Sequence, residues 1–312
     1  MQQQVAFHHE SLFYRGEDEF LAGTLPFVYE ALDADEPVLA AAGIQRIEQL
    51  KHALGYEAKR VYFADMRTLG RNPARIIPAW TRFVEQHSTP DRPVRGIGEP
   101  IWPGRSPAEV NECHRHESLL NTAFRDGRPW RLLCPYDLDG LGQPVIEAAR
   151  RSHPFVREKG ISRDSADYLN PCRGPGPFEG SLPEPPIRPQ ELTFTRGELP
   201  VLRQFVSAQA QRAPLPSERT EDLVVAINEL ATNSMCYGGG RGKLRIWRES
   251  KSLLCEVSDL GHISEPLAGR KRPRPGQHSG RGLWLVNNLC DLVQVRSAPS
   301  GSVVRIHMQI AS

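Results

Sequence analysis

A proline-rich stretch in the middle of the chain is the feature that most restricts its fold. Eight prolines fall between His153 and Leu192, at positions 154, 171, 175, 177, 183, 185, 186 and 189. Proline lacks a backbone N–H donor and fixes its own φ angle, so this stretch can form neither a long helix nor a central strand. We therefore predict a semi-rigid, partly extended linker over residues 154–191, between separate domains at residues 1–153 and 192–312.

The length and charge of the chain are consistent with two soluble domains. Its 312 residues allow two domains of ~150 residues, each able to bury a core. The 39 Lys and Arg residues nearly balance the 37 Asp and Glu residues, giving a net charge of +2. This balance gives no electrostatic reason to expect nucleic acid or an anionic membrane as the main partner.

The N-terminus and the cysteines indicate a cytoplasmic protein. The first residues, MQQQVAFHHE, lack the basic start and apolar run of a signal peptide, and no later stretch approaches ~18 uncharged apolar residues. The six cysteines are scattered, with no CxxC pair. This spacing argues against both a disulfide framework and a structural zinc site.

Short apolar runs alternate with helical patterns in the first half of the chain. Buried strands are predicted at residues 37–44, 60–65, 94–101 and 130–137. Between the second and third, residues 72–87 place five apolar side chains on one helical face, namely Ile76, Ile77, Trp80, Phe83 and Val84. The alternation predicts an α/β domain with an open, mostly parallel sheet and helices on both faces.

The second half has a different order of elements. A strand at 192–195 precedes a helix from about residue 199 and a second helix from Ser217. Strands at 243–249 and 253–259, a helix at 282–291 and two closing strands, LVQVRS and SVVRIHM, follow. This order predicts an α+β sandwich, with helices on one face of a mixed sheet.

A carboxylate and a carboxamide lie four residues apart in the second of these helices, at Glu229 and Asn233, and so share one face. An amide oxygen is a suitable neutral ligand for Mg2+, and a carboxylate can orient or deprotonate an attacking hydroxyl group. Taken alone, such a pair is more often a solvated stripe.

Two glycine-containing segments follow the pair. Asp259 ends a strand two residues before Gly261, and Gly280 and Gly282 precede an apolar helix. An aspartate there can accept the adenine amino proton, and glycines before a helix let its free N–H groups meet phosphate. Each feature alone is typical of a turn or a cap, but together with the pair they predict an ATP site. GGGRGK is not a P-loop, because Leu244 follows it.

The segments ELATNS, DLG and SGRGLWLV resemble the N box and the two glycine boxes of the GHKL ATPases, named for gyrase, Hsp90, histidine kinases and MutL. The anti-sigma factor serine/threonine kinases match best, over residues 192–312. The resemblance implies the Bergerat α+β sandwich, Glu229 as catalytic base and Asn233 as ligand of Mg2+. It implies further nucleotide contacts at Asp259, Gly261, Gly280, Arg281, Gly282 and Ser302, although the family often has threonine in place of Ser302.

The basic segment between the glycine boxes resembles the ATP lid of that family. Its residues Arg270, Lys271, Arg272 and Arg274 either pair with phosphates or an acidic partner, or belong to a disordered basic loop. Arg281 adjoins the glycines and is the strongest candidate for a phosphate contact.

The choice within the superfamily depends on the flanking sequence. A sensor histidine kinase needs a long dimerisation helix before the ATPase domain, where this chain has prolines, and a gyrase-like protein needs a transducer domain after it. The resemblance therefore implies a regulatory kinase that phosphorylates a STAS-domain anti-anti-sigma protein, controls a sigma factor and forms a homodimer. Two alternatives stay open: a non-catalytic ATP-binding module that sequesters a sigma factor or another partner, and an N-terminal enzyme with a regulatory ATPase tail.

Residues 5–153 resemble the MEDS sensory domain, through FHHESLFYRGEDEF, RNPARIIPAWTRF and VRGIGEPIWPGRS among others. The resemblance implies a RecA/KaiC-like sheet that senses small molecules. No GxxxxGK[ST] follows a predicted strand, so we expect no nucleotide there. A candidate pocket for a small ligand or metal comprises His9, Glu99, Cys113, His116, Glu117 and Cys134, together with His153. The alternative is a helix face with a buried cysteine and solvated charges.

Overall fold

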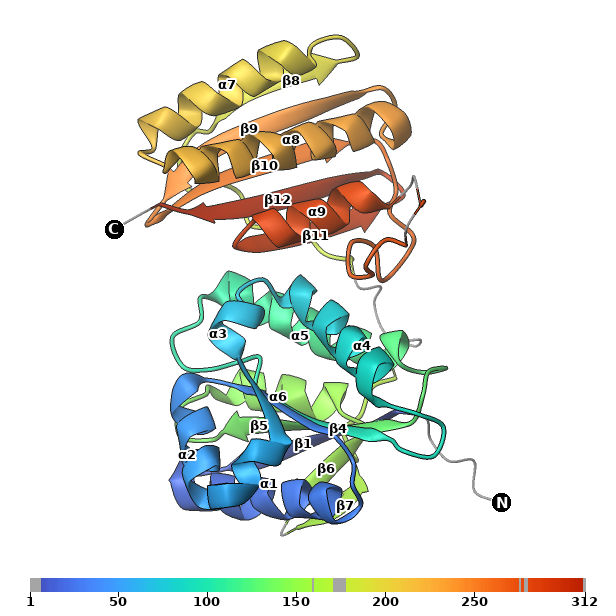
Figure 1. The fold of residues 1–312 in the computed structure, drawn as a ribbon. Helices are drawn as coiled ribbons and strands as arrows, with labels where there is room; N and C mark the ends of the chain where they lie inside the picture. The colour runs from blue at the N-terminus through green and yellow to red at the C-terminus, as the bar shows by residue number, and fades with distance from the viewer. Residues whose placement is uncertain (1–6, 159, 171–177, 275, 278–279, 311–312) are drawn as a thin grey trace. The chain divides into compact units, whose positions relative to one another are not determined.

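The structure is a computed structural model that describes residues 7–158, 160–170, 178–274, 276–277 and 280–310. The chain divides into two compact units, Met1–Pro175 and Gly176–Ser312. Each unit has its own sheet and its own covering helices (Figure 1). The predicted fold classes, a parallel α/β sheet followed by an α+β sandwich, are confirmed.

The N-terminal unit is built on a seven-stranded sheet in the order β3-β2-β4-β5-β1-β6-β7. Neighbouring strands are parallel, except that β6 and β7 form an antiparallel pair at one edge. The bounds are β1 Phe7–Tyr14, β2 Val38–Ala42, β3 Val61–Asp65, β4 Val94–Gly98, β5 Trp130–Asp137, β6 Phe155–Glu158 and β7 Ile161–Asp164.

Helices cover both faces of this sheet (Figure 1). Helices α1 and α2 contact each other on one face, and α5 contacts both α4 and α6 on the other. All five apolar residues predicted to share a face of α4 are buried, which explains why that helix packs on the sheet. The bounds are α1 Gly16–Asp33, α2 Ile44–Leu54, α3 Met66–Leu69, α4 Ile76–His87, α5 Pro107–Ala123 and α6 Gln143–Ser152, with short 3-10 turns at Gly55–Arg60 and Pro73–Arg75.

The sequence analysis missed strand β1, and the compact N-terminal unit extends beyond residue 153 into the predicted linker. Strand β1 carries the fully buried polar residues His9, Glu10 and Ser11, which interrupt the apolar run expected of a central parallel strand. Strands β6 and β7 lie inside the predicted linker, 154–191. Glu10 accepts two hydrogen bonds from Arg157 of β6, at 3.0 and 3.2 Å, so a buried ion pair joins this edge to the sheet.

The C-terminal unit has a five-stranded sheet in the order β11-β12-β10-β9-β8. All neighbouring strands are antiparallel, so the expectation of a mixed sheet was wrong. Two helices connect β8 to β9 and return the chain to the end it left, which sets the strands antiparallel. The bounds are β8 Gln190–Thr195, α7 Leu199–Arg212, α8 Ser217–Tyr237, β9 Arg241–Glu249, β10 Ser252–Asp259, α9 Arg281–Leu289, β11 Leu292–Ala298 and β12 Gly301–Gln309.

Helices α7, α8 and α9 lie on one face of this sheet and bury the main apolar core against it (Figure 1). The second half of the predicted linker also belongs to this unit. The backbone N–H of Ser297 donates to the carbonyl of Phe178 at 3.0 Å, and Arg305 donates to the carbonyl of Pro183 at 2.7 Å. Arg245 pairs with Glu184 at 2.8 Å. Residues 178–184 are therefore part of the C-terminal fold.

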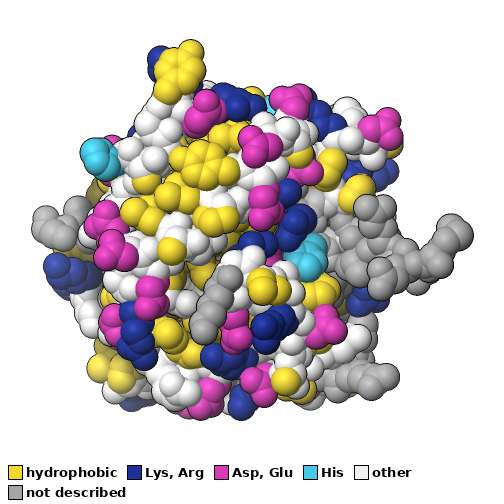
Figure 2. All heavy atoms as spheres, turned by 90° about the horizontal axis from the view of Figure 1, so that it is seen from below, with side chains coloured by type: hydrophobic (Ala, Val, Ile, Leu, Met, Phe, Trp, Pro, Cys, Tyr) yellow, Lys and Arg dark blue, Asp and Glu magenta, His cyan; other side chains and the backbone are white. Residues whose placement is uncertain are grey.

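The surface carries charges of both signs. Figure 2 views the face of the N-terminal unit that bears α1 and α2, where Lys and Arg side chains alternate with Asp and Glu. Within the described part of the chain, no helix combines the length and the apolar character needed to cross a bilayer.

Candidate functional site

The predicted pair Glu229 and Asn233 faces the start of α9. Helices α8 and α9 pack side by side (Figure 1). A Cβ atom added to Gly282 would lie 2.9 Å from Glu229 Oε2 and 3.3 Å from Asn233 Nδ2. Both side chains are half-buried, and within the described residues neither forms a hydrogen bond or an ion pair. The carboxylate and the carboxamide are therefore free to bind a ligand beside the glycine.

The first turn of α9 has the properties of an anion site. Gly280, the residue before the helix, has the left-handed conformation with φ 80°, and no side chain of the described residues caps the helix. The first backbone N–H groups of a helix have no partner inside it and carry partial positive charge. Arg281 begins the helix and is exposed. This turn can receive phosphate oxygens, which is the chemistry predicted for Gly280, Arg281 and Gly282.

Asp259 is fixed at the end of β10 by three donors. Its Oδ1 accepts hydrogen bonds from the backbone N–H of Gly261 at 2.8 Å and from the Ser302 hydroxyl at 2.9 Å. Its Oδ2 accepts from the Ser234 hydroxyl at 2.6 Å. Ser302 lies directly opposite Asp259 on β12, which explains how it reaches the carboxylate. The carboxylate retains lone pairs to accept a further donor, such as an exocyclic amine.

Glycines surround Asp259 because a side chain there would collide with it. A Cβ atom at Gly238 would lie 2.5 Å from Asp259 Cγ, and one at Gly261 would lie 3.0 Å from Oδ1. A Cβ atom at Gly301, whose φ is 146°, would lie 2.5 Å from the carbonyl oxygen of Asp259. The sequence analysis gave no role to Gly238 or to Ser234. The signal for both was their place at the C-terminal end of α8, next to the predicted site.

The basic segment between the glycine boxes is only partly accessible. Arg270 is 6% exposed, so it is not a free arm for phosphate, and Lys271 pairs with Glu265 at 3.5 Å. Asn287 of α9 donates to the carbonyl of Gly269 at 2.9 Å and so attaches this segment to the helix. Arg272 and Arg274 are exposed and remain the candidates for contacts with phosphate or a partner.

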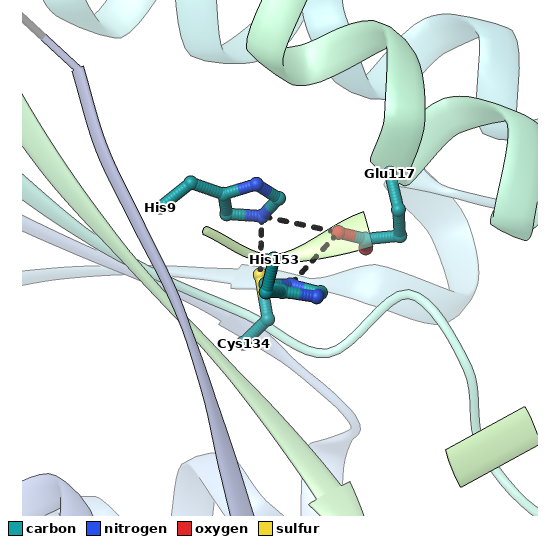
Figure 3. Close-up of side chains that lie close together, drawn as sticks. All are labelled: His9, Glu117, Cys134 and His153. Atoms are coloured by element: carbon teal, nitrogen blue, oxygen red, sulfur yellow. Dashed lines mark hydrogen bonds and ion pairs between the residues drawn. The ribbon is translucent and has the colours of Figure 1, made fainter. Parts of the chain in front are cut away.

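The candidate pocket of the N-terminal unit divides into two groups. His9, Glu117 and Cys134 converge with His153, and their ligand atoms all lie within 4.8 Å of one another (Figure 3). Burial, with a contribution from His153, lowers the pKa of His9 to about 4. Burial and the charge of Glu117 raise the pKa of the Cys134 thiol well above its usual range.

The other three predicted residues lie apart from this group. Glu99 accepts a hydrogen bond from Tyr14 at 3.0 Å and from the backbone N–H of Gly43 at 3.3 Å. Burial raises its pKa in spite of these bonds. The Cys113 thiol donates to the carbonyl of Pro100 at 3.3 Å, and burial raises its pKa to about 12. His116 is buried but is not among the four convergent ligands.

Comparison with known families agrees with the two units. Residues 192–308 match the family model of the histidine kinase-like ATPase domain, and residues 8–154 match the MEDS family, the methanogen/methylotroph DcmR sensory domain. The C-terminal half is thus an ATPase domain of the GHKL type. The chain joins it to an N-terminal MEDS domain, so both predicted resemblances are confirmed.

Two solved structures are similar to this chain at low TM-scores. The Acinetobacter baumannii histidine kinase AdeS has a TM-score of 0.25 at 13% identity, over 40% of this chain and 70% of that one. A structure of the RsbU and RsbW domains from Mycobacterium tuberculosis has a TM-score of 0.31 at 13% identity, over 68% of this chain and 50% of that one. No curated protein matches the chain significantly. At these scores the similarity says nothing about function.

Proposed function

We propose that the protein is an ATP-dependent regulatory kinase that transfers the γ-phosphoryl group of ATP to a serine or threonine hydroxyl of a STAS-domain partner. The observation that carries this proposal is the convergence of Glu229 and Asn233 on Gly282, at the uncapped start of α9. It joins a base, a metal ligand and an anion site within one GHKL-type domain. The MEDS domain supplies the sensory input.

Each residue has a defined part in this reaction. The amides at the start of α9 and Arg281 bind the phosphates, and Asp259 accepts the adenine amino proton. Asn233 holds Mg2+ through its amide oxygen, and the ion when bound neutralises charge on the phosphates. Glu229 accepts the proton of the attacking hydroxyl as its oxygen bonds to the γ-phosphorus, and the bond to the bridging oxygen of ADP breaks.

The identity of the partner rests on the motif resemblance and on the chain before the domain. Between α6 and β8, the described residues form two short strands and a packed segment rather than a long helix with a phosphorylated histidine. This arrangement favours a separate protein as phosphate acceptor. A sigma factor bound by the kinase would then be released or held according to the phosphorylation of the STAS protein.

The first test is phosphotransfer by the full chain and its Glu229→Gln variant. Both are incubated with Mg2+, γ-labelled ATP and a panel of STAS-domain proteins from the same organism. We expect the label on one STAS protein and a ~10²–10⁴-fold slower transfer by the variant, because a positioned general base contributes about that much. Affinity for ATP should be unchanged, since Glu229 acts on the hydroxyl group.

Two variants control this experiment. Glu221→Gln changes an exposed glutamate on the same helix and should transfer phosphate normally. Asn233→Ala should weaken ATP binding in the presence of Mg2+ and leave ATP binding in its absence nearly unchanged. Equal rates for wild type and Glu229→Gln would remove the base assignment. ATP binding without any labelled STAS protein would favour the non-catalytic module that sequesters a sigma factor.

A further inference from the structure

Four side chains from separate elements of the MEDS domain meet in its buried interior. His9 comes from β1, Glu117 from α5, Cys134 from β5, and His153 directly follows α6 (Figure 3). Glu117 Oε2 lies 3.1 Å from His9 Nε2 and 3.2 Å from His153 Nε2. The Cys134 sulfur lies 3.4 Å from His9 Nε2. All four residues are at most 1% exposed.

The Nδ1 atom of each imidazole lies within hydrogen-bonding distance of an acceptor outside the cluster. His153 Nδ1 lies 2.7 Å from the carbonyl oxygen of Ala149, which can only accept, so this nitrogen carries the proton. For His9 the partner is Asn121 Oδ1 at 3.1 Å. The orientation of that amide is fixed, because Asn121 Nδ2 donates to the carbonyl of Ser152 at 2.8 Å. His9 Nδ1 therefore also carries its proton.

As a result, Nε2 of His9 and Nε2 of His153 are both unprotonated. Each of them faces the Glu117 carboxylate, and Nε2 of His9 also faces the Cys134 sulfur. Within the described residues, neither oxygen of Glu117 nor Nε2 of His153 has a hydrogen bond of normal geometry. The Glu117 carboxylate lies 3.1 and 3.2 Å from two unprotonated nitrogens, and these acceptors repel one another in a buried site unless a cation or a further proton lies between them. Protonating both imidazoles would set two cations side by side, with ring centroids 4.0 Å apart.

A divalent ion satisfies this arrangement in both charge and geometry. One thiolate and one carboxylate carry two negative charges, and two neutral imidazoles add none, so an ion of charge +2 leaves the buried site neutral. Zinc takes four tetrahedral N, S and O ligands at ~2.0–2.3 Å, which sets its ligand atoms roughly 3.3–3.7 Å apart. The three contacts of 3.1, 3.2 and 3.4 Å are close to these separations, and all four ligand atoms lie within 4.8 Å of one another, so small side-chain shifts would complete the tetrahedron.

We propose that His9, Glu117, Cys134 and His153 form a closed, four-coordinate site for a divalent transition metal, with Zn2+ as the preferred ion. Nitrogen and sulfur ligands disfavour Mg2+ and Ca2+, which require oxygen. Four protein ligands leave no open position, as in structural rather than catalytic zinc sites. The metal would join α5 and the end of α6 to the two central strands, and binding would release the thiol proton to solvent.

This site differs from the kind that cysteine spacing reveals. The absence of a CxxC pair argued against structural zinc, but only one cysteine is needed when two histidines and a glutamate complete the ligand set. The ligands are separated by up to 144 positions along the chain, from His9 to His153. Only the topology of the sheet brings them together.

Cobalt substitution tests the proposal on the full chain. The protein is stripped with a chelator in the absence of nucleotide and then titrated with Co2+. The background carries Cys236→Ser and Cys172→Ser, because Cys236 is exposed and Cys172 lies outside the described residues. We expect one tightly bound Co2+ per chain, with the visible bands of tetrahedral coordination and a near-ultraviolet thiolate-to-cobalt band. Zn2+ should abolish both, and a Co2+ ion at Asn233 would show no thiolate band.

Variants identify the ligands. Cys134→Ser should lose the thiolate band and weaken Co2+ binding more than about tenfold, whereas Cys113→Ser, an equally buried thiol outside the cluster, should behave like wild type. Asn121→Ala should keep the thiolate band but weaken binding ~10–100-fold, because it orients His9. Failure of the background protein to take up Co2+, or an oxygen-type spectrum that Cys134→Ser leaves unchanged, would overturn the proposal and leave protons holding the cluster.

Discussion

The two candidate sites of this chain are built in opposite ways. The nucleotide site of the C-terminal unit is assembled from short contiguous segments, and its key side chains, Glu229 and Asn233, are half-buried and unpaired among the described residues. The cluster of the N-terminal unit takes one residue from each of four distant places and buries all of them. One site is made to exchange a ligand with solvent, and the other is closed.

The difference explains which physical signals each site leaves in a sequence. An exchangeable site needs glycines, because ligand and backbone must approach closely, and glycines at fixed intervals form a readable motif. A closed site needs only a few polar side chains on elements that already pack together. Its signal is a polar residue where a strand should be apolar, as at His9 in the middle of β1.

The largest expected effect that separates the two sites is ligand protection. Mg-ATP at ~100 times its dissociation constant should stabilise the unit that binds it by about 2.7 kcal/mol. In hydrogen-exchange mass spectrometry of the full chain, this protection should fall on peptides of α8, β10 and α9. A chelator that removes Zn2+ should instead deprotect peptides of β1, β5 and α5. Protection of β1 and β5 by ATP would contradict the assignment of the two sites.

A half-buried histidine of the C-terminal unit, His307, provides a second comparison. Burial lowers the pKa of His307 to about 4 from its ordinary value of 6.5, and the neighbouring Arg305 lowers it further. The folded state prefers the neutral ring, so its contribution to stability is complete above the unfolded pKa and is lost as the pH falls from 6.5 towards 4. Near pH ~5 the free energy of unfolding should fall by roughly 2 kcal/mol.

The measurement is urea unfolding of the full chain and of His307→Gln at neutral and acidic pH. His307 lies 3.0 Å from the amide oxygen of Gln294, on the neighbouring strand β11. The variant is expected to have a smaller loss of stability in acid than wild type. Identical losses for the two proteins would show that other groups carry the pH dependence.

The smallest predicted effect concerns the candidate nucleotide site and needs no substitution of a proposed catalytic side chain. A methyl group at Gly282 would lie 2.9 Å from Glu229 Oε2 and would crowd the ligand position. Gly282→Ala should weaken ATP binding about tenfold, or ~1.4 kcal/mol. Alanine is the better helix former, so stability without ligand should stay equal or rise by ~0.5–1 kcal/mol. Titration calorimetry and thermal unfolding measure the two quantities.

Asn288→Ala is the matched control for this prediction, because Asn288 is exposed on the same helix and, among the described residues, its side chain bonds only to the carbonyl of Trp284. It should bind ATP like the wild type. Normal ATP affinity in Gly282→Ala would place the nucleotide away from the start of α9.

Much of the fold follows from the sequence where local pattern and tertiary environment agree. The apolar face of α4 and the strands β2 to β5 were predicted because their buried side chains are mostly apolar, although β4 also buries Arg95. Strand β1 and the β6–β7 pair were not, because Glu10 and Arg157 satisfy each other only after the sheet forms. A buried polar residue has no interpretation until its partner is known.

The same limit applies to the sites. The residues proposed for the nucleotide site were predicted together because they occur in ordered motifs, and the structure adds Ser234 and Gly238 as supports of Asp259. In the sensory domain, Cys113, His116 and Glu117 lie at positions i, i+3 and i+4, and this helical spacing suggested that they line one pocket. The helix instead directs Glu117 into the cluster, while Cys113 bonds to the carbonyl of Pro100. Helical spacing shows which residues share a face but not which of them meet a strand.

The segment before β8 has a consequence for how such proteins can be recombined. The match to the ATPase family begins at residue 192, yet Phe178 is buried in the core of the C-terminal unit, and Arg245 and Arg305 hold residues 183–184. A gene fusion that exchanged sensory domains at the family boundary would remove this segment and expose charged groups on the sheet. The segment to be kept with the ATPase domain in such a fusion therefore starts no later than position 178, fourteen residues before the family match begins at 192. This start lies within the proline-rich stretch that was predicted to be a linker.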